Sequence, residues 1–272
     1  MLRILMYHAL VPRHEPYMAR VHVEAAQFAA QMAWLAASPY PVLPLAEALA
    51  QLPGRQPAVA LTFDDGYRSL LLAAAPVLAQ HGFAATLFLT TDAVGAASYA
   101  GPPGFAASVP RHDPPLTWPE LRQLQAQGWG IEAHGGSHRA LAGRPVAEQA
   151  AELRRSRAAI ARHLGRAPAY FAFPYGSYDR HTLRLLAAAG YQAACAVHTG
   201  LATAAHDLRR LPRLEVTAGL PLPAFAQLVR TGHLSAAAHG RAWLRDHLYR
   251  LPLARDVLHH AGRLAAGRPA PE

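Results

Sequence analysis

The sequence predicts an α/β fold built from parallel βα units. Short apolar runs alternate along the 272-residue chain with longer stretches whose apolar side chains recur at helical spacing. Seven of the apolar runs are typical of strands, and polar residues follow the C-terminal ends of several of them. Because a barrel gathers the C-terminal ends of its strands into one mouth, this placement favours a closed barrel over an open doubly wound sheet, which would give the same alternation.

In the first half of the chain we expect strands at residues 4–7, 59–63 and 84–90. Helices are predicted at residues 24–37, 45–52 and 69–80, where apolar side chains fall on one face. Pro76 lies inside the last of these helices and should kink it, since proline has no backbone N–H to donate. Residues 92–115 are rich in Gly, Pro and Ala and lack periodicity, which predicts a long loop of the kind that often binds substrate.

The second half continues the alternation with strands at residues 130–133, 170–173, 191–197 and 211–216. Thr117 and Pro119 suit the N-cap and first turn of a helix that ends near residue 127. Further helices are predicted at residues 145–164 and 180–189, the second of them capped by Asp179 or Ser177. The polar ends of the predicted strands carry His8, Asp64, Asp65, His134 and the Pro174-Tyr175 pair.

We expect two parts in the chain: a barrel over residues 1–219 and a basic helical extension over residues 220–272. The extension contains amphipathic stretches with Arg and His but few acids. Packing on the barrel as a final helix is the first interpretation of these stretches. Peripheral contact with a membrane surface or a partner is the alternative.

The chain is basic, with a formal net charge of +9 and no lysine. Arginine favours bidentate contacts with carboxylates and phosphates. The arginines are scattered and no nucleic-acid-binding motif accompanies them, so we expect no nucleic-acid partner. Anionic lipid or anionic glycan would be attracted by the same charge.

The location is predicted to be cytoplasmic, with peripheral contact at the inner membrane as a refinement. Cys195 is the only cysteine, so no intrachain disulfide can form. The first residues lack the apolar core and cleavage site of a signal peptide. No apolar run reaches the roughly 20 residues that span a bilayer.

Two short polar motifs point to a metal site. Asp64 and Asp65 are adjacent carboxylates at a strand end, and a metal would separate their roles because one could bind it while the other acts as a base. His134 and His138 can converge on one ion if the intervening glycines turn the backbone. Together they supply Asp/His/His with an open position, which suits a catalytic zinc or similar divalent ion. A solvated turn and a surface histidine pair are the alternatives.

The motifs Thr62-Phe63-Asp64-Asp65-Gly66, His134-Gly135-Gly136-Ser137-His138 and Phe173-Pro174-Tyr175-Gly176 occur in the order found in the polysaccharide deacetylases of carbohydrate esterase family 4. The resemblance covers roughly residues 1–216. It implies a distorted (β/α)7–8 TIM-like barrel, a divalent metal, and removal of acetyl groups from sugars. By this resemblance Asp65, His134 and His138 bind the metal, Asp64 is the general base, and the backbone N–H of Tyr175 stabilises the oxyanion.

The chain departs from the family pattern at three places. Ala172 stands where the resemblance implies an arginine that holds the base. The fourth family motif is not recognisable after Gly190, and Gly232-His233-Leu234 matches the late Leu-x-His motif poorly, so His233 is interpreted as a surface residue.

These departures resemble the circularly permuted poly-N-acetylglucosamine deacetylases, in which the last strand lies at the N-terminus. Leu5-Met6-Tyr7-His8 is similar to that displaced strand end. His8 would then be the general acid, with a capping histidine as the alternative. Arg213 is a candidate for the missing arginine, with a surface charge as the alternative.

The predicted function is therefore metal-dependent removal of N-acetyl groups from N-acetylhexosamine in a glycan or a glycan precursor. A lipid-linked or nucleotide-linked sugar is the expected substrate, since a basic surface attracts phosphate-bearing carriers. Two alternatives stay open: a non-catalytic barrel that binds glycan or a partner, and a hydrolase of a non-sugar C–N bond.

Overall fold

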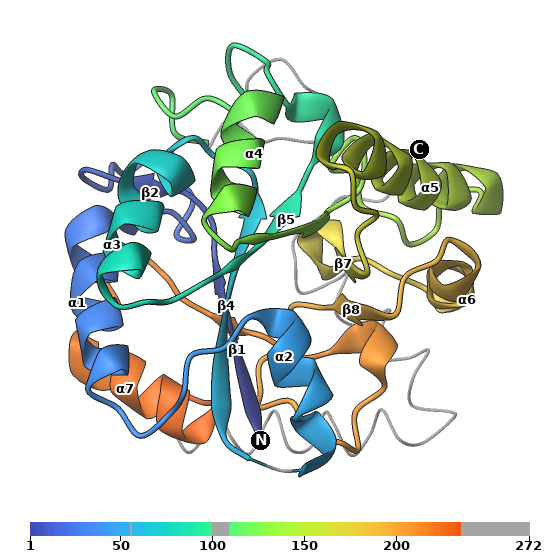
Figure 1. The fold of residues 1–272 in the computed structure, drawn as a ribbon. Coiled ribbons are helices and arrows are strands. Elements are labelled where there is room, and N and C mark those ends of the chain that lie inside the picture. Colours follow the sequence, from blue (N-terminus) through green and yellow to red (C-terminus); the bar gives the residue numbers. More distant parts are fainter. Residues whose placement is uncertain (55, 100–108, 235–272) are drawn as a thin grey trace.

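Seven parallel strands form one curled sheet in the computed structural model, which describes residues 1–54, 56–99 and 109–234. Figure 1 shows the sheet with the helices around it. The strand order is β8-β7-β6-β5-β4-β1-β9. The strands are β1 (Leu2–Tyr7), β4 (Ala58–Asp65), β5 (Thr86–Leu89), β6 (Gly130–Ala133), β7 (Tyr170–Ala172), β8 (Ala193–Cys195) and β9 (Leu214–Glu215).

The segment that leads into β9 joins the two edges of the sheet. Strand β9 pairs with β1 through Leu5 and Leu214. On its other side, the Leu211 N–H donates to the Ala194 carbonyl and the Leu211 carbonyl accepts from the Ala196 N–H, both at 2.8 Å. The curled sheet therefore closes on itself, and the predicted distorted barrel is confirmed.

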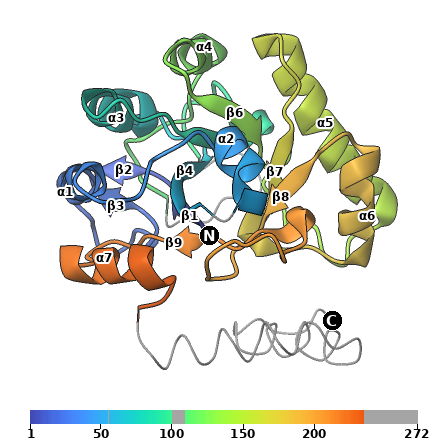
Figure 2. The same ribbon diagram turned by 60° about the horizontal axis from the view of Figure 1, so that its bottom comes forward.

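Helices cover the outside of the strands, as Figure 2 shows. They are α1 (Ala25–Ala36), α3 (Ala75–Gln80), α4 (Trp118–Ala126), α5 (Val146–Leu164), α6 (Arg180–Ala188) and α7 (Leu222–Thr231). A further helix, α2 (Leu45–Ala50), lies across the end of the barrel at which β1 begins. Short 3-10 turns complete the connections at Leu52–Gly54, Thr91–Ala93, Pro174–Gly176 and Leu208–Arg210.

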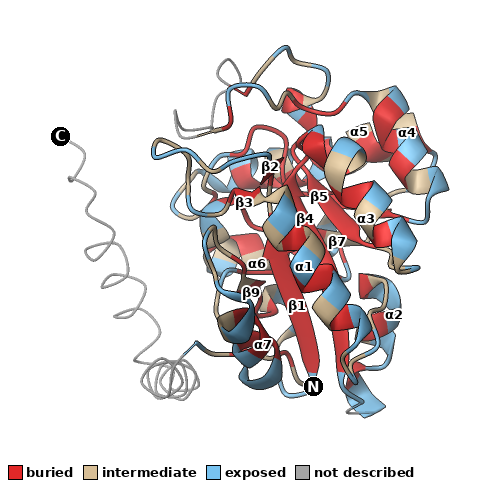
Figure 3. Ribbon diagram, turned by 90° about the vertical axis from the view of Figure 1, so that its left-hand side faces the viewer, coloured by how far each residue is buried: buried red, intermediate tan, exposed pale blue. Residues whose placement is uncertain are grey.

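Alternation along the central strands separates an inner core from an outer core. In β4, Val59, Leu61 and Phe63 pack outward against the helices, whereas Ala58 and Ala60 point into the barrel. Figure 3 shows that β1 and β4 are buried while the helices carry exposed residues between buried ones. The same alternation carries the side chain of Asp64 to the inside of the barrel.

Two helix starts follow their predicted capping chemistry. In α4 the Thr117 side chain accepts from the Glu120 N–H while the Glu120 carboxylate accepts from the Thr117 N–H, a complete capping box. In α6 the cap is Asp179 and not Ser177, because the Asp179 carboxylate accepts from the N–H groups of His181 and Thr182.

The predicted helix at residues 69–80 consists of two parts. A π-helical turn at Leu70–Ala74 precedes α3, and Pro76 lies in the first turn of α3. The change from π-helical to α-helical geometry thus comes just before Pro76. In the first turn of a helix the missing N–H of a proline matters least. The parallel pair β2 (Leu10–Val11) and β3 (Val23–Glu24) was not predicted, because each strand has only two residues.

The first helix of the predicted extension packs on the barrel. Phe225 of α7 meets Trp34 of α1 edge to face, with ring centroids 5.8 Å apart. Residues 235–272 lie outside the described residues, so the rest of the extension and its membrane contact stay predictions. Within the described ranges, none of the helices has the length and apolar character needed to cross a bilayer.

Candidate active site

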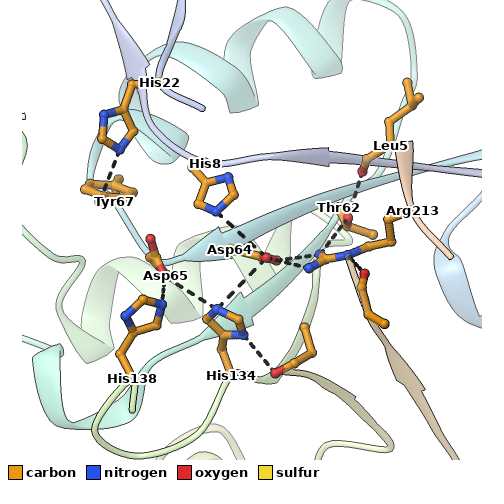
Figure 4. Close-up of polar contacts among 12 residues, drawn as sticks. Leu5, His8, His22, Thr62, Asp64, Asp65, Tyr67, His134, His138 and Arg213 are labelled. Atoms are coloured by element: carbon orange, nitrogen blue, oxygen red, sulfur yellow. Dashed lines mark hydrogen bonds and ion pairs between the residues drawn. The ribbon is translucent and has the colours of Figure 1, made fainter. Parts of the chain in front are cut away.

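A cavity of about 310 Å³ opens at the C-terminal ends of the strands. Six of the residues that line it come from the predicted site: His8, Asp64, Asp65, His134, His138 and Tyr175. They lie at or just after the C-terminal ends of β1, β4, β6 and β7, so the barrel brings together residues that are far apart in the sequence. Figure 4 shows the side chains of the first five directed toward one another.

Asp65, His134 and His138 form one buried cluster. One potential ligand atom from each lies within 4.8 Å of the others. The Nε2 atoms of His138 and His134 are 3.1 Å and 3.6 Å from the Asp65 Oδ1 atom. Within the part of the chain that the structure describes, this is the only such group of three or more His, Cys, Asp and Glu residues.

The chemistry of this cluster fits a divalent cation. Asp65 Oδ1 is buried, and within the described residues it makes no hydrogen bond despite its nearness to both imidazoles. His134 donates from Nδ1 to the Ala172 carbonyl at 2.8 Å, which leaves the Nε2 lone pair facing Asp65. Burial lowers the pKa of His134 to about 4, so its ring stays neutral at physiological pH. A neutral imidazole and an unsatisfied carboxylate oxygen are the ligands that zinc takes.

Three site residues have a left-handed backbone conformation. Among the described residues, the non-glycine residues with positive φ are Asp65 at 76°, His138 at 56° and Tyr175 at 57°. This region is costly for a residue with a Cβ atom, and such conformations gather at functional sites. Asp65 ends β4, His138 lies in the loop after β6, and Tyr175 lies in the 3-10 turn after β7, yet all three line the same cavity.

Asp64 is held by Arg213 on the inside of the barrel. The two guanidinium Nη atoms donate to the two carboxylate oxygens at 2.7 Å each, and the Arg213 side chain is 0% exposed. Burial alone would raise the pKa of Asp64, but the charge of Arg213 and its hydrogen bonds oppose burial, and the pKa lies below its usual value. Arg213 is therefore not a surface charge, and Asp64 is kept ionised.

Ala172 leaves room for this arrangement. Its methyl group belongs to the inner core of the barrel, where an arginine at the same position is what the family resemblance implies. Arg213 also donates from Nε to the Ala196 carbonyl at 3.1 Å, so the residue just before β9 supplies the guanidinium that β7 lacks.

His8 and Tyr175 both line the cavity. His8 Nε2 is 4.0 Å from Asp64 Oδ2, and the His8 side chain is 16% exposed. The Tyr175 ring packs against the His138 ring with centroids 4.7 Å apart. His233, interpreted from the sequence as a surface residue, follows α7 and does not line the cavity.

Comparison with known proteins decides the family. The polysaccharide deacetylase family profile matches residues 51–194, which is more than half of the chain. The chain belongs to the polysaccharide deacetylase family. It is a hydrolase that removes N-acetyl groups from glycans, and metal dependence is the norm for the family.

One sequence relative and two solved structures resemble this deacetylase, and the solved structures share its fold. The Bacillus subtilis protein YxkH, named for the same family, is 27% identical over 234 residues, which is 85% of this chain and 76% of that protein. The Streptococcus pyogenes deacetylase PplD superposes with a TM-score of 0.73 at 23% identity, covering 85% of this chain and 98% of that one. IcaB from Ammonifex degensii gives a TM-score of 0.70 at 23% identity, covering 85% and 96%.

The deacetylase cavity also contains residues that the sequence did not single out for the site. His22 and Glu215 line it beside His8. His22 is almost fully buried, and its Nε2 lies 3.5 Å from the Tyr67 hydroxyl. Glu215 is paired with Arg20 at 2.6 Å. No local sequence pattern marks His22 as a site residue. Its loop reaches the barrel mouth only because β2 pairs with β3. Glu215 could have been suspected from its place two residues after Arg213.

Proposed function

We propose that Asp65, His134 and His138 hold a divalent ion, zinc in the first place, and that Asp64, His8 and Tyr175 carry out hydrolysis of the acetamide of an N-acetylhexosamine. One observation supports this more than any other. The unsatisfied Asp65 oxygen faces two imidazoles, while the neighbouring carboxylate of Asp64 is held by Arg213 in the same cavity.

Each protein group has a separate task in this proposal. When bound, the cation supplies Lewis acidity toward the acetyl carbonyl and acidifies water. Asp64 accepts the proton of the attacking water, because the ion pair with Arg213 keeps its carboxylate ionised. The backbone N–H of Tyr175 would donate to the oxyanion that develops on the carbonyl.

His8 would protonate the leaving amine. Its Nε2 lies 4.0 Å from Asp64 Oδ2, so the general acid and the general base face the same space. Nε2 is the ring nitrogen directed at Asp64, whereas His8 Nδ1 is buried and has no hydrogen-bond partner among the residues that the structure describes. The Ala172 carbonyl meanwhile fixes the ring of His134 and takes no part in proton transfer.

We further propose that the substrate sugar is linked to a lipid or a nucleotide. The net charge of +9 supports this, since a basic surface raises the local concentration of phosphate-bearing substrates. Peripheral membrane contact and a cytoplasmic location stay predictions that accompany it. Equal kcat/KM on neutral chito-oligomers and on a lipid-linked sugar would contradict this substrate preference.

Acetate release tests the proposed roles. Wild-type protein loaded with zinc should release acetate from N-acetylglucosamine oligomers, and Asp64→Asn should abolish release while retaining zinc. Acetate release by Asp64→Asn at the wild-type rate would contradict the role of Asp64. A panel of non-sugar amides in the same assay tests whether the substrate is a sugar at all.

A further inference from the structure

The loop between β6 and α5 carries two of the three proposed metal ligands, His134 and His138. The backbone turns through Gly135 at φ 82° and reaches His138 at φ 56°. A loop of this shape leaves the N–H groups of Gly136 and Ser137 outside any strand or helix. Buried backbone donors need a partner, so something beyond the loop must satisfy them.

Glu152 of α5 satisfies both donors. Its Oε2 atom accepts from the Gly136 N–H at 2.8 Å and from the Ser137 N–H at 2.9 Å. Its Oε1 atom accepts from the Ser137 hydroxyl at 2.9 Å. The Glu152 side chain is 13% exposed, so water competes little for these bonds.

The carboxylate is itself held in place. Arg155, one turn further along α5, pairs with Glu152 at 2.7 Å and with Asp92 at 2.9 Å. On the other side of the loop, the Asp92 N–H donates to the Gly136 carbonyl at 2.9 Å. The loop is thus tied to α5 through Glu152 and to the end of β5 through Asp92.

We propose that Glu152 is a positioning residue for the metal centre. By fixing the backbone of Gly136 and Ser137, it sets where the His138 ring lies relative to His134 and Asp65. This inference rests on the proposed metal site, and it adds a residue on a helix that never touches the ion. Charge-assisted bonds to the backbone are stronger than neutral ones, so a carboxylate suits this task better than an amide.

The test compares Glu152→Gln with Glu148→Gln on the same helix. Glu148 is paired with Arg144 at 3.1 Å and its side chain is 53% exposed, so the control loses an ion pair at the α5 end of the loop and leaves the bonds to Gly136 and Ser137 in place. Groups that orient metal ligands are typically worth about 10–100-fold in metal affinity. We expect the zinc dissociation constant, measured by chelator competition, to rise by about that factor in Glu152→Gln and to stay unchanged in Glu148→Gln.

A second readout needs no metal. Amide hydrogen exchange at Gly136 and Ser137 should be faster in Glu152→Gln than in Glu148→Gln, each measured with a chelator present. If Glu152→Gln does not fold, Ser137→Ala removes the hydroxyl bond alone and should weaken zinc binding in the same direction by a smaller factor.

Equal zinc affinity in Glu152→Gln and Glu148→Gln would overturn the inference, even if exchange at the loop were faster. Failure of the proposed metal site gives a different result. In that case the wild-type protein would bind no zinc, or Asp65→Ala would bind it as tightly as the wild type.

Discussion

Replacement of Arg213 by methionine would leave Asp64 as a buried carboxylate without its cation. The pair is joined by two hydrogen bonds of 2.7 Å, and the two side chains are 0% and 3% exposed. Opposite charges about 4 Å apart attract by about 4 kcal/mol at an effective dielectric constant of about 20. Removal of one member of a buried pair costs about 3–5 kcal/mol. We therefore expect Arg213→Met to lower the free energy of unfolding by about 3–5 kcal/mol at neutral pH.

The pH dependence has a definite sign. In the wild type, burial would raise the pKa of Asp64, but the charge of Arg213 and its hydrogen bonds lower it, so the pair stabilises the fold above the unfolded pKa. This stability is lost as the pH falls through the folded-state pKa. In Arg213→Met, burial acts without that cation and raises the pKa of Asp64. The destabilisation should then be complete at neutral pH and should shrink as the carboxyl takes up a proton.

Urea unfolding with a chelator present measures these quantities for the wild type, both single variants and Asp64→Asn/Arg213→Met. The double variant should regain much of the stability lost in Arg213→Met, because it buries no unpaired charge. A loss below about 1 kcal/mol in Arg213→Met, typical of an exposed ion pair, would refute the reasoning. A double variant no more stable than Arg213→Met would refute it as well.

Three further substitutions test a proposed metal ligand, a helix cap and the turn that carries Tyr175. Asp65→Ala should abolish both zinc binding and acetate release without unfolding the protein, and zinc retained at wild-type affinity would contradict the ligand assignment. Thr117→Ala removes the cap of α4 and should cost about 1 kcal/mol in urea unfolding with kcat/KM unchanged; a lowered kcat/KM would show that the helix start affects the site. Gly176 has φ 62°, and Gly176→Ala would place a Cβ atom against Val197, so this variant should lower the free energy of unfolding by at least about 1–2 kcal/mol. It should also lower kcat, because Tyr175 is displaced. A wild-type kcat would argue against the role of Tyr175.

The parts of the fold that the sequence predicts are those encoded locally. Runs such as residues 59–63 and 130–133 are apolar and end at a polar or glycine-rich turn, so their strands could be placed within a few residues. Thr117 and Asp179 predict helix starts, because capping depends on residues three positions apart. From β1 to β8 the strands of the main sheet lie side by side in chain order, as sequential strands usually do.

Long-range contacts are what the sequence does not predict. Closure of the sheet depends on Leu211 bonding to Ala194 and Ala196, a pairing that no local pattern marks. Glu152 lies in a helix whose sequence suggests only a solvated face with arginines, yet it bonds a loop 15 residues earlier. The Asp64–Arg213 contact spans 149 residues, and only the family resemblance suggested it.

The most direct test of the proposed metal site is anomalous diffraction at the zinc absorption edge from crystals grown with zinc. We expect one strong anomalous peak between the Asp65 carboxylate and the Nε2 atoms of His134 and His138, beside Asp64. Full zinc loading with the peak at another set of side chains, or no peak at this cluster, would contradict it.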